Sequence, residues 1–157
     1  MFSTIIWATD GSEQSDSTLP IVTELASIHD SKVIAVHIGE RFVGGRFGGG
    51  PLLADEDSLR QKIESQVDDL RQAGFDATLK VVSTYHHDIA ALIVEEAAAV
   101  GADLIVVGTH GYGELGTLLH GSTSGALTRT AHCPVLVVPP VAHREPAVGA
   151  AASSAGS

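Results

Sequence analysis

The sequence predicts an α/β fold: a five-stranded parallel sheet, doubly wound, with helices on both faces. Strand-like and helix-like stretches alternate five times along the 157 residues. Several of the strand-like stretches are continuous runs of apolar, β-branched residues, which is typical of parallel strands that helices cover on both sides. A single domain of this kind accounts for residues 1–140.

The first three elements follow from apolar runs and their period. Thr4 to Ala8 is an apolar strand that ends at the turn-forming residues 9–12. A helix is expected over Ser15 to His29, where apolar residues recur at three- and four-residue steps and Pro20 is tolerated near the helix start. Lys32 to Ile38 is expected to be a second buried strand.

The clearest predicted helix follows a glycine-rich stretch. Gly39 to Pro51 holds six glycines in thirteen residues and is expected to be a mobile loop. After it, Asp55 to Gln72 places apolar residues on one face of a helix and acids in its first turn. Gly74 lies just past this helix, where glycine commonly ends one.

The remaining elements alternate in the same way. Strands are expected over Ala77 to Ser83, Asp103 to Val107 and Val135 to Val138, and helices over Ile89 to Val100 and Ser124 to Ala131. Asp88 can cap the first of these helices, and Gly101 stops it. From Val141 to Ser157 the apolar period is lost, so a disordered tail is expected.

The composition restricts the class of ligand and the cellular compartment that are expected. Asp and Glu number 19 against 9 Lys and Arg, and the formal charge of −10 argues against nucleic acid as a partner but allows a mononucleotide. Cys133, the single cysteine, excludes an internal disulfide and is interpreted as a small buried hydrophobe. The eight histidines are scattered, so no protein metal site is expected. Without a secretion signal or membrane span, the protein is expected to be cytoplasmic.

Two loops are candidates for a ligand site. In a doubly wound, Rossmann-like sheet of strand order 3-2-1-4-5, ligands bind beyond the carboxyl ends of the strands, where the order reverses beside strand one. The loops at this point carry Thr9-Asp10-Gly11-Ser12 and the segment Gly108 to Gly121. Both loops therefore predict a ligand site.

The residue types in these loops indicate how a ligand would lie. Gly108 and Gly111 lack Cβ, so their N–H groups can approach an anion closely. Residues 121–124 open a helix whose N-terminus and hydroxyls favour phosphate. Asp10 would repel phosphate and is better suited to ribose hydroxyls or an adenine amine. On spacing alone, tight turns and a helix cap at Ser122 explain the pattern equally well.

The motifs together resemble a known family. Gly108-x2-Gly111-x9-Gly121-Ser122, with Thr9-Asp10-Gly11-Ser12 and Pro134-Val135-Leu136-Val137-Val138, resembles the universal stress protein family over about residues 1–140. The glycine spacing is similar to that of its ATP-binding branch. The resemblance implies a dimeric, adenine-nucleotide-binding regulatory protein of the stress response. It also implies Mg²⁺ or Mn²⁺ with the phosphates and a homodimer through Pro134 to Val138.

The resemblance also implies roles for single residues. Asp10 would contact the nucleoside, Thr9 would lie in the same site, and Ile38 would lie beside adenine through its backbone. Ribose and phosphate contacts would come from Gly108, His110, Gly111, Gly121, Ser122 and Thr123. The chain departs from its relatives at 86–88, His-His-Asp, where many carry a glycine.

Alternatives remain open. AMP or cyclic AMP can take the place of ATP, since the residues do not specify how many phosphates fit. A slow ATPase or autokinase is a second hypothesis, although no Lys or Arg lies between Gly101 and Thr128 to stabilise a phosphoryl-transfer transition state. A third is a nucleotide-free dimeric scaffold. In the leading hypothesis, nucleotide orders the loop over Gly39 to Pro51 and thereby a surface for unknown protein partners.

Overall fold

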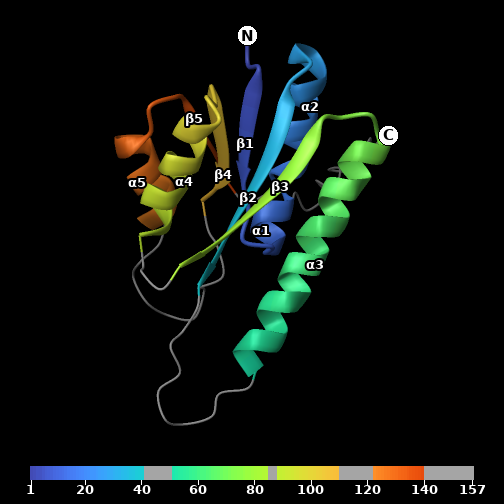
Figure 1. Ribbon diagram of the computed structural model, residues 1–157. Helices are drawn as coiled ribbons and strands as arrows, with labels where there is room; N and C mark the ends of the chain where they lie inside the picture. Colours follow the sequence, from blue (N-terminus) through green and yellow to red (C-terminus); the bar gives the residue numbers. More distant parts are fainter. Residues whose placement is uncertain (41–50, 85–87, 110–121, 140–157) are drawn as a thin grey trace, which may run out of the picture.

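The computed structural model describes residues 1–40, 51–84, 88–109 and 122–139. Five strands of this part form one all-parallel sheet in the order β3-β2-β1-β4-β5 (Figure 1), which confirms the predicted fold class. The strands are β1 Thr4–Ala8, β2 Lys32–Glu40, β3 Ala77–Thr84, β4 Leu104–Gly108 and β5 Val135–Val138. Because β1 is central and pairs with both β2 and β4, the strand order reverses on either side of it.

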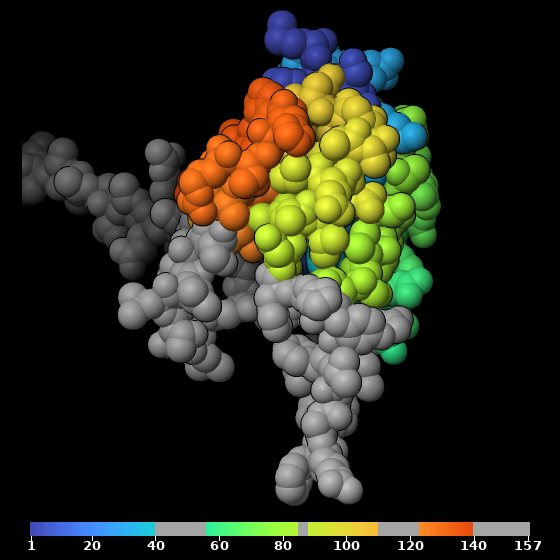
Figure 2. Space-filling model, turned by 60° about the vertical axis from the view of Figure 1, so that its left-hand side comes forward, coloured from blue at the N-terminus to red at the C-terminus, as the bar shows by residue number. Residues whose placement is uncertain are grey.

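Helices cover both faces of the sheet. They are α1 Glu13–Asp16, α2 Leu19–His29, α3 Pro51–Gln72, α4 Ile89–Ala99 and α5 Ser122–Thr130. Figure 1 shows α1, α2 and α3 on one side of the sheet and α4 and α5 on the other. A space-filling view of the second side shows α4 and α5 packed against each other (Figure 2).

The central strand contributes to two cores. Ile5 and Trp7 face the core under α2 and α3, while Ile6 and Ala8 face the core under α4 and α5. All four are at most 5% exposed, because successive side chains of a strand point to opposite faces. Burying one large apolar side chain of this kind contributes about 1.5–3 kcal/mol. Both cores therefore anchor β1, the strand that leads into the first candidate loop.

The single helix predicted over Ser15 to His29 is wrong. The chain forms α1 and α2, with a turn between them that contains Thr18. Pro20 has no N–H to donate to the carbonyl of Asp16, and its ring would clash with that carbonyl in a continuous helix. The indole Nε1 of Trp7 donates to Thr18 Oγ1 over 2.8 Å and fixes this turn against β1.

The bounds of the predicted loop over Gly39 to Pro51 also change. β2 continues to Glu40, because its last two residues pair with the end of β3. α3 begins at Pro51 rather than at Asp55, and proline suits the first turn of a helix because an N–H there has no helical partner. Residues 41–50 lie outside the described residues. The other elements agree with their predicted bounds to within two residues.

The predicted helix ends are confirmed where the structure describes them. Asp88 caps α4, and its Oδ1 accepts a hydrogen bond from the N–H of Ala91 at 3.0 Å. Gly74 and Gly101 follow α3 and α4 with φ values of +95° and +63°. The tail predicted over 141–157 lies outside the described residues.

Cys133 differs from the prediction, because it is half-buried rather than buried. It lies just before the edge strand β5 and packs at the margin of the core under α4 and α5. Among the described residues, no helix combines the length and apolar character needed to cross a membrane.

Candidate functional site

The parallel sheet brings the ends of β1, β2 and β4 to one edge (Figure 1). Asp10 follows β1, and Gly108 ends β4. A Cβ built on Gly108 would lie 3.4 Å from the main-chain oxygen of Gln14 in α1. This is an ordinary contact distance, so the segment after β1 packs directly against the end of β4. The two candidate loops start side by side.

Asp10 is fixed in orientation by its own loop. Its Oδ1 accepts a hydrogen bond from the N–H of Ser12 at 2.9 Å and another from Ser15 Oγ at 2.6 Å. Ser12 is the N-cap of α1, and its Oγ accepts from the N–H of Ser15 at 3.2 Å. The carboxylate is therefore held at the start of α1, where the aligned N–H groups favour negative charge.

Gly11 has a conformation and a position that favour glycine. Its φ is +78°, in the left-handed region that side chains disfavour. Its N–H donates to Thr9 Oγ1 at 3.1 Å. A Cβ on Gly11 would lie 3.0 Å from Cδ2 of Leu59, which comes from α3. Close packing of α3 over this loop therefore depends on the missing side chain.

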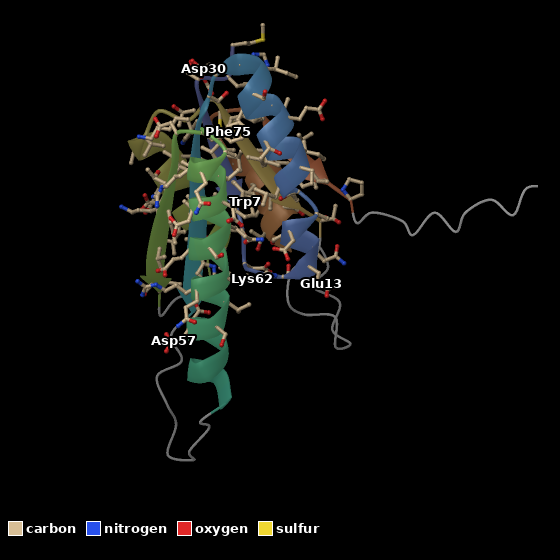
Figure 3. The ribbon with its side chains drawn as sticks, turned by 90° about the vertical axis from the view of Figure 1, so that its right-hand side faces the viewer. Trp7, Glu13, Asp30, Asp57, Lys62 and Phe75 are labelled. Carbon is tan, nitrogen blue, oxygen red and sulfur yellow. The ribbon has the colours of Figure 1, made fainter. Side chains whose placement is uncertain are left out.

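Polar side chains of α3 also hold the loop. Lys62 Nζ donates to the main-chain oxygen of Gly11 at 2.8 Å and forms an ion pair with Asp16 of α1. Gln66 Nε2 donates to Asp16 Oδ1 at 2.8 Å. Figure 3 shows Lys62 on α3 at the level of α1, where Glu13 is labelled. Leu59 and Lys62 of α3 thus contact the segment that carries Asp10. Lys62 and Gln66 contact α1, the helix that follows this segment.

His37 joins the same segment from β2. Its ring is buried, with 2% of the residue exposed. Nδ1 lies 3.0 Å from the main-chain oxygen of Thr9, and Nε2 lies 2.6 Å from Glu56 Oε1 in α3. A Cβ on Gly39 would lie only 2.8 Å from that Glu56 oxygen, so a glycine there leaves room for the contact.

The structure brings some of the predicted site residues together and leaves others apart or undescribed. Thr9, Asp10 and Gly108 gather at the edge described above. The side chain of Ile38 lies in the core under α4 and α5, so its backbone is the part that can face a ligand. Ser122 and Thr123 are the first residues of α5. Three further predicted site residues, His110, Gly111 and Gly121, lie outside the described residues.

Sequence reasoning missed Lys62, His37 and Glu56. A signal for Lys62 was available, because it lies one residue before Ile63 and so at the margin of the apolar stripe of α3. His37 stood out from its apolar strand only as one of eight scattered histidines. In the part of the chain that the structure describes, no cluster of three or more His, Cys, Asp or Glu could hold a metal ion.

Comparison with known proteins gives the family. The family model described as the Universal stress protein family matches residues 1–139. The chain belongs to this family. A universal stress protein of Thermus aquaticus, named for the 3′ region of a sulfhydrylase gene, is 30% identical over 141 residues, which cover 88% of this chain and 99% of that protein. Universal stress protein A homolog 1 of Coxiella burnetii is 33% identical over 140 residues, 85% and 94% of the two chains.

Solved structures of universal stress proteins share this fold. One from Burkholderia pseudomallei is 27% identical, with a TM-score of 0.66 over 88% of this chain and 96% of its own. A universal stress protein in complex with cAMP superimposes with a TM-score of 0.64 at 24% identity, covering 88% and 97%. An Archaeoglobus fulgidus member in complex with dAMP gives 0.60 at 20% identity, covering 87% and 97%. The last two likenesses show the fold alone.

Proposed function

We propose that this chain binds an adenine nucleotide beyond the carboxyl ends of β1 and β4, and acts as a nucleotide-dependent regulatory protein of the stress response. The observation that carries the proposal is the loop of Thr9 and Asp10. It lies where the strand order reverses, beside Gly108, and α1 and α3 hold it in place. A prearranged polar loop at this point of a doubly wound sheet is the usual location of a ligand.

All the predicted site residues except Thr9 have a direct role in the proposal. Asp10 accepts hydrogen bonds from ribose hydroxyls, because a carboxylate already oriented by two donors loses little freedom on binding. The backbone of Ile38 lies beside adenine, and Gly108 admits the ribose. The phosphates lie on the glycine signature and the start of α5, at His110, Gly111, Gly121, Ser122 and Thr123.

ATP is the nucleotide proposed, in the manner of the ATP-binding branch, because the sequence keeps all three glycines and the serine of that signature. Two structural neighbours were solved with cAMP and dAMP, which supports an adenine nucleotide as the class of ligand. Mg²⁺ or Mn²⁺ would balance the charge of the phosphates. The glycine loop itself supplies no Lys or Arg, since none lies between Gly101 and Thr128.

We further propose that two copies associate through Pro134 to Val138. β5 pairs only with β4 in the described sheet, and Leu136 on it is 37% exposed. A sheet edge with an exposed apolar side chain favours cover by another chain. Light scattering of the wild type and of Leu136→Glu tests this proposal: a dimer that becomes a monomer supports it, and a wild-type monomer contradicts it.

The experiment that tests the nucleotide site is mass spectrometry of small molecules released from the purified, denatured protein, with calorimetric titration of ATP and cAMP. Asp10→Ala and Gly121→Val should lose the nucleotide, whereas Glu24→Ala, an exposed carboxylate on α2, should keep it. No nucleotide released and no binding in titration would reject the proposal and favour a nucleotide-free scaffold. Steady phosphate release that Asp10→Ala abolishes would instead indicate an ATPase.

A further inference from the structure

The two contacts of His37 are both hydrogen bonds only when the pair holds one proton more than a neutral histidine beside a carboxylate. The main-chain oxygen of Thr9 only accepts hydrogen bonds, so Nδ1, 3.0 Å away, bonds to it only when this nitrogen carries hydrogen. In a neutral imidazole, Nε2 would then present a lone pair to Glu56 Oε1 at 2.6 Å. Two lone pairs at this distance repel. Both hydrogen bonds form together only with one further proton, either on the imidazolium or on the carboxyl group of Glu56.

The pair lies where α3 meets the candidate site. His37 reaches the end of β1 through Thr9, whose neighbour in the chain is Asp10. Glu56 extends from the first turn of α3 whose side chains the structure describes, and it packs against the Cβ position of Gly39. The contacts of His37 with Thr9 and Glu56 thus join three segments: the end of β1, the end of β2 and the first described part of α3.

The other charged groups around His37 are already engaged. On α3, Lys62 binds the main-chain oxygen of Gly11 and Asp16 of α1. After β1, the carboxylate of Asp10 accepts from Ser12 and Ser15. On β3, Lys80 pairs with Glu96 of α4 on the opposite face of the sheet. Glu56 is the charged side chain that the described residues place in direct contact with the ring.

We propose that His37 and Glu56 form a proton-dependent latch between α3 and the loop of Asp10, and that the latch couples nucleotide affinity to pH. The coupling to nucleotide affinity rests on the proposed function. With the proton bound, the latch is closed and Thr9 is fixed. When the proton leaves, Glu56 and Nε2 repel, and the part of α3 around Glu56 separates from the end of β1, while Lys62 and Gln66 keep their contacts further along the helix. Both residues are positioning residues, which act on the ligand through Thr9 and Asp10.

The direction of the pH effect follows from proton counting. The closed state binds one proton more than the open state, so raising the pH favours opening, by up to about tenfold per pH unit. Histidine is the side chain that ordinarily changes charge between pH 5 and 8. We expect affinity for cAMP, whose phosphate keeps one charge over this range, to fall at least about threefold from pH 6 to pH 8.5.

The first test needs no ligand. Nitrogen-detected imidazole spectra of the full chain, with His37 assigned by its loss in His37→Gln, should show hydrogen on Nδ1 from pH 6 to pH 8.5. Amide exchange of residues 56–63, corrected for the intrinsic effect of pH, should accelerate as the pH rises. A neutral His37 with hydrogen on Nε2 alone would overturn the latch, and so would exchange that does not depend on pH.

Variants separate the latch from a merely structural contact. Glu56→Gln can donate from its amide to a neutral Nε2, so it should close the latch without the extra proton and abolish the pH dependence of exchange. Glu64→Gln is the matched control, because Glu64 lies on the same helix, is half-exposed and pairs with Arg60. It should keep the wild-type pH dependence. An unchanged pH dependence in Glu56→Gln would overturn the proposal.

Failure of the latch can be told from failure of the proposed function. If the wild type binds neither ATP nor cAMP at any pH, the nucleotide proposal fails, whereas the spectra and the exchange rates still decide the latch. If cAMP binds with an affinity that is equal at pH 6 and pH 8.5 while exchange changes, the coupling to the site is refuted. A loss of affinity at pH 8.5 that Glu56→Gln removes supports both proposals together.

Discussion

Lys62 on α3 donates a hydrogen bond to the main-chain oxygen of Gly11, 2.8 Å away, although the two residues are 51 positions apart in the chain. Gly11 follows Asp10 directly, so the longest described helix of the molecule is attached to the loop of the candidate site. The same ammonium group pairs with Asp16 of α1. Lys62 therefore ties the loop and the helix after it to one point on α3.

Replacing Lys62 with methionine should weaken both stability and ligand binding. Methionine keeps the length of the side chain but loses the bond to Gly11 and the pairing with Asp16. We expect the free energy of unfolding to fall by about 0.5–1.5 kcal/mol, the ordinary net value of the bond to Gly11, because the partly exposed ion pair with Asp16 adds little. Urea denaturation measures it. Arg60→Met is the control, since Arg60 pairs with Glu64 on the exposed side of α3, and a loss equal to that of Lys62→Met would contradict the attachment.

Substitution of Gly11 by alanine should destabilise the protein more than the same change at Gly101. Both glycines have positive φ, +78° and +63°. A methyl group at Gly101 meets no atom within 4 Å, whereas one at Gly11 lies 3.0 Å from Leu59. Backbone strain alone costs about 1–3 kcal/mol, so the excess at Gly11 measures the close packing of α3. Equal losses in thermal unfolding would show that Leu59 moves aside without cost.

Thr18→Val should cost about 1–3 kcal/mol of stability, because it leaves the buried indole N–H of Trp7 without its acceptor. Valine keeps the shape of threonine, so the loss reports the hydrogen bonds of the hydroxyl, from Trp7 and to the carbonyl of Ser15, rather than a cavity. Thr23→Val provides the comparison, since the hydroxyl of Thr23 bonds only to carbonyls of its own helix. Chemical denaturation of both variants should rank Thr18→Val as clearly the less stable one.

The orientation of Asp10 should matter as well as its charge. Ser15→Ala removes the 2.6 Å hydrogen bond to Asp10 Oδ1 but leaves the carboxylate in place. We expect it to lower nucleotide affinity several-fold, and Asp10→Asn to lower it by at least about tenfold, equivalent to about 1.4 kcal/mol. Calorimetric titration with ATP measures both. Unchanged affinity in Ser15→Ala would mean that the ligand orients Asp10 by itself.

The thiol of Cys133 should react slowly below alkaline pH. Burial, and then the negative charge of Asp103, raise the pKa of this thiol, because both disfavour the thiolate. Since the thiolate is the reactive form, alkylation by iodoacetamide should accelerate only at a higher pH than in the urea-unfolded chain. Asp103→Asn should shift the midpoint of the native profile downward. Coincident profiles for native and unfolded protein would contradict a raised pKa of the Cys133 thiol.

Local patterns sufficed to predict the sheet, but not the turn at Thr18. The strands are apolar runs whose character does not depend on distant residues, and β1 and β5 match their predicted bounds. The break between α1 and α2 combines the missing N–H of Pro20 with a hydrogen bond from Trp7. Trp7, the partner of Thr18, lies eleven positions away in β1. The spacing of apolar residues within a helix therefore cannot predict this hydrogen bond.

The positions of Asp10 and Gly108 in the fold were predictable from the same kind of information. Strand order and loop composition located Asp10 and Gly108 at one edge, since the ends of parallel strands meet there. The pair of His37 and Glu56 depends on how α3 returns to the sheet after residues 41–50, and the bond of Lys62 depends on the rotation of α3 about its axis. Both are consequences of three-dimensional packing that spacing in the sequence does not encode.

The central place of β1 also determines when the candidate site can form during synthesis of the protein. β1, β2 and β3 are translated first and can pair as soon as they leave the ribosome, whereas β4 follows later in the chain. Until β4 arrives, one edge of β1 presents unpaired N–H and C=O groups, a template for incorrect pairing with another chain. A nascent chain halted before β4 therefore lacks Gly108 and with it one side of the candidate site.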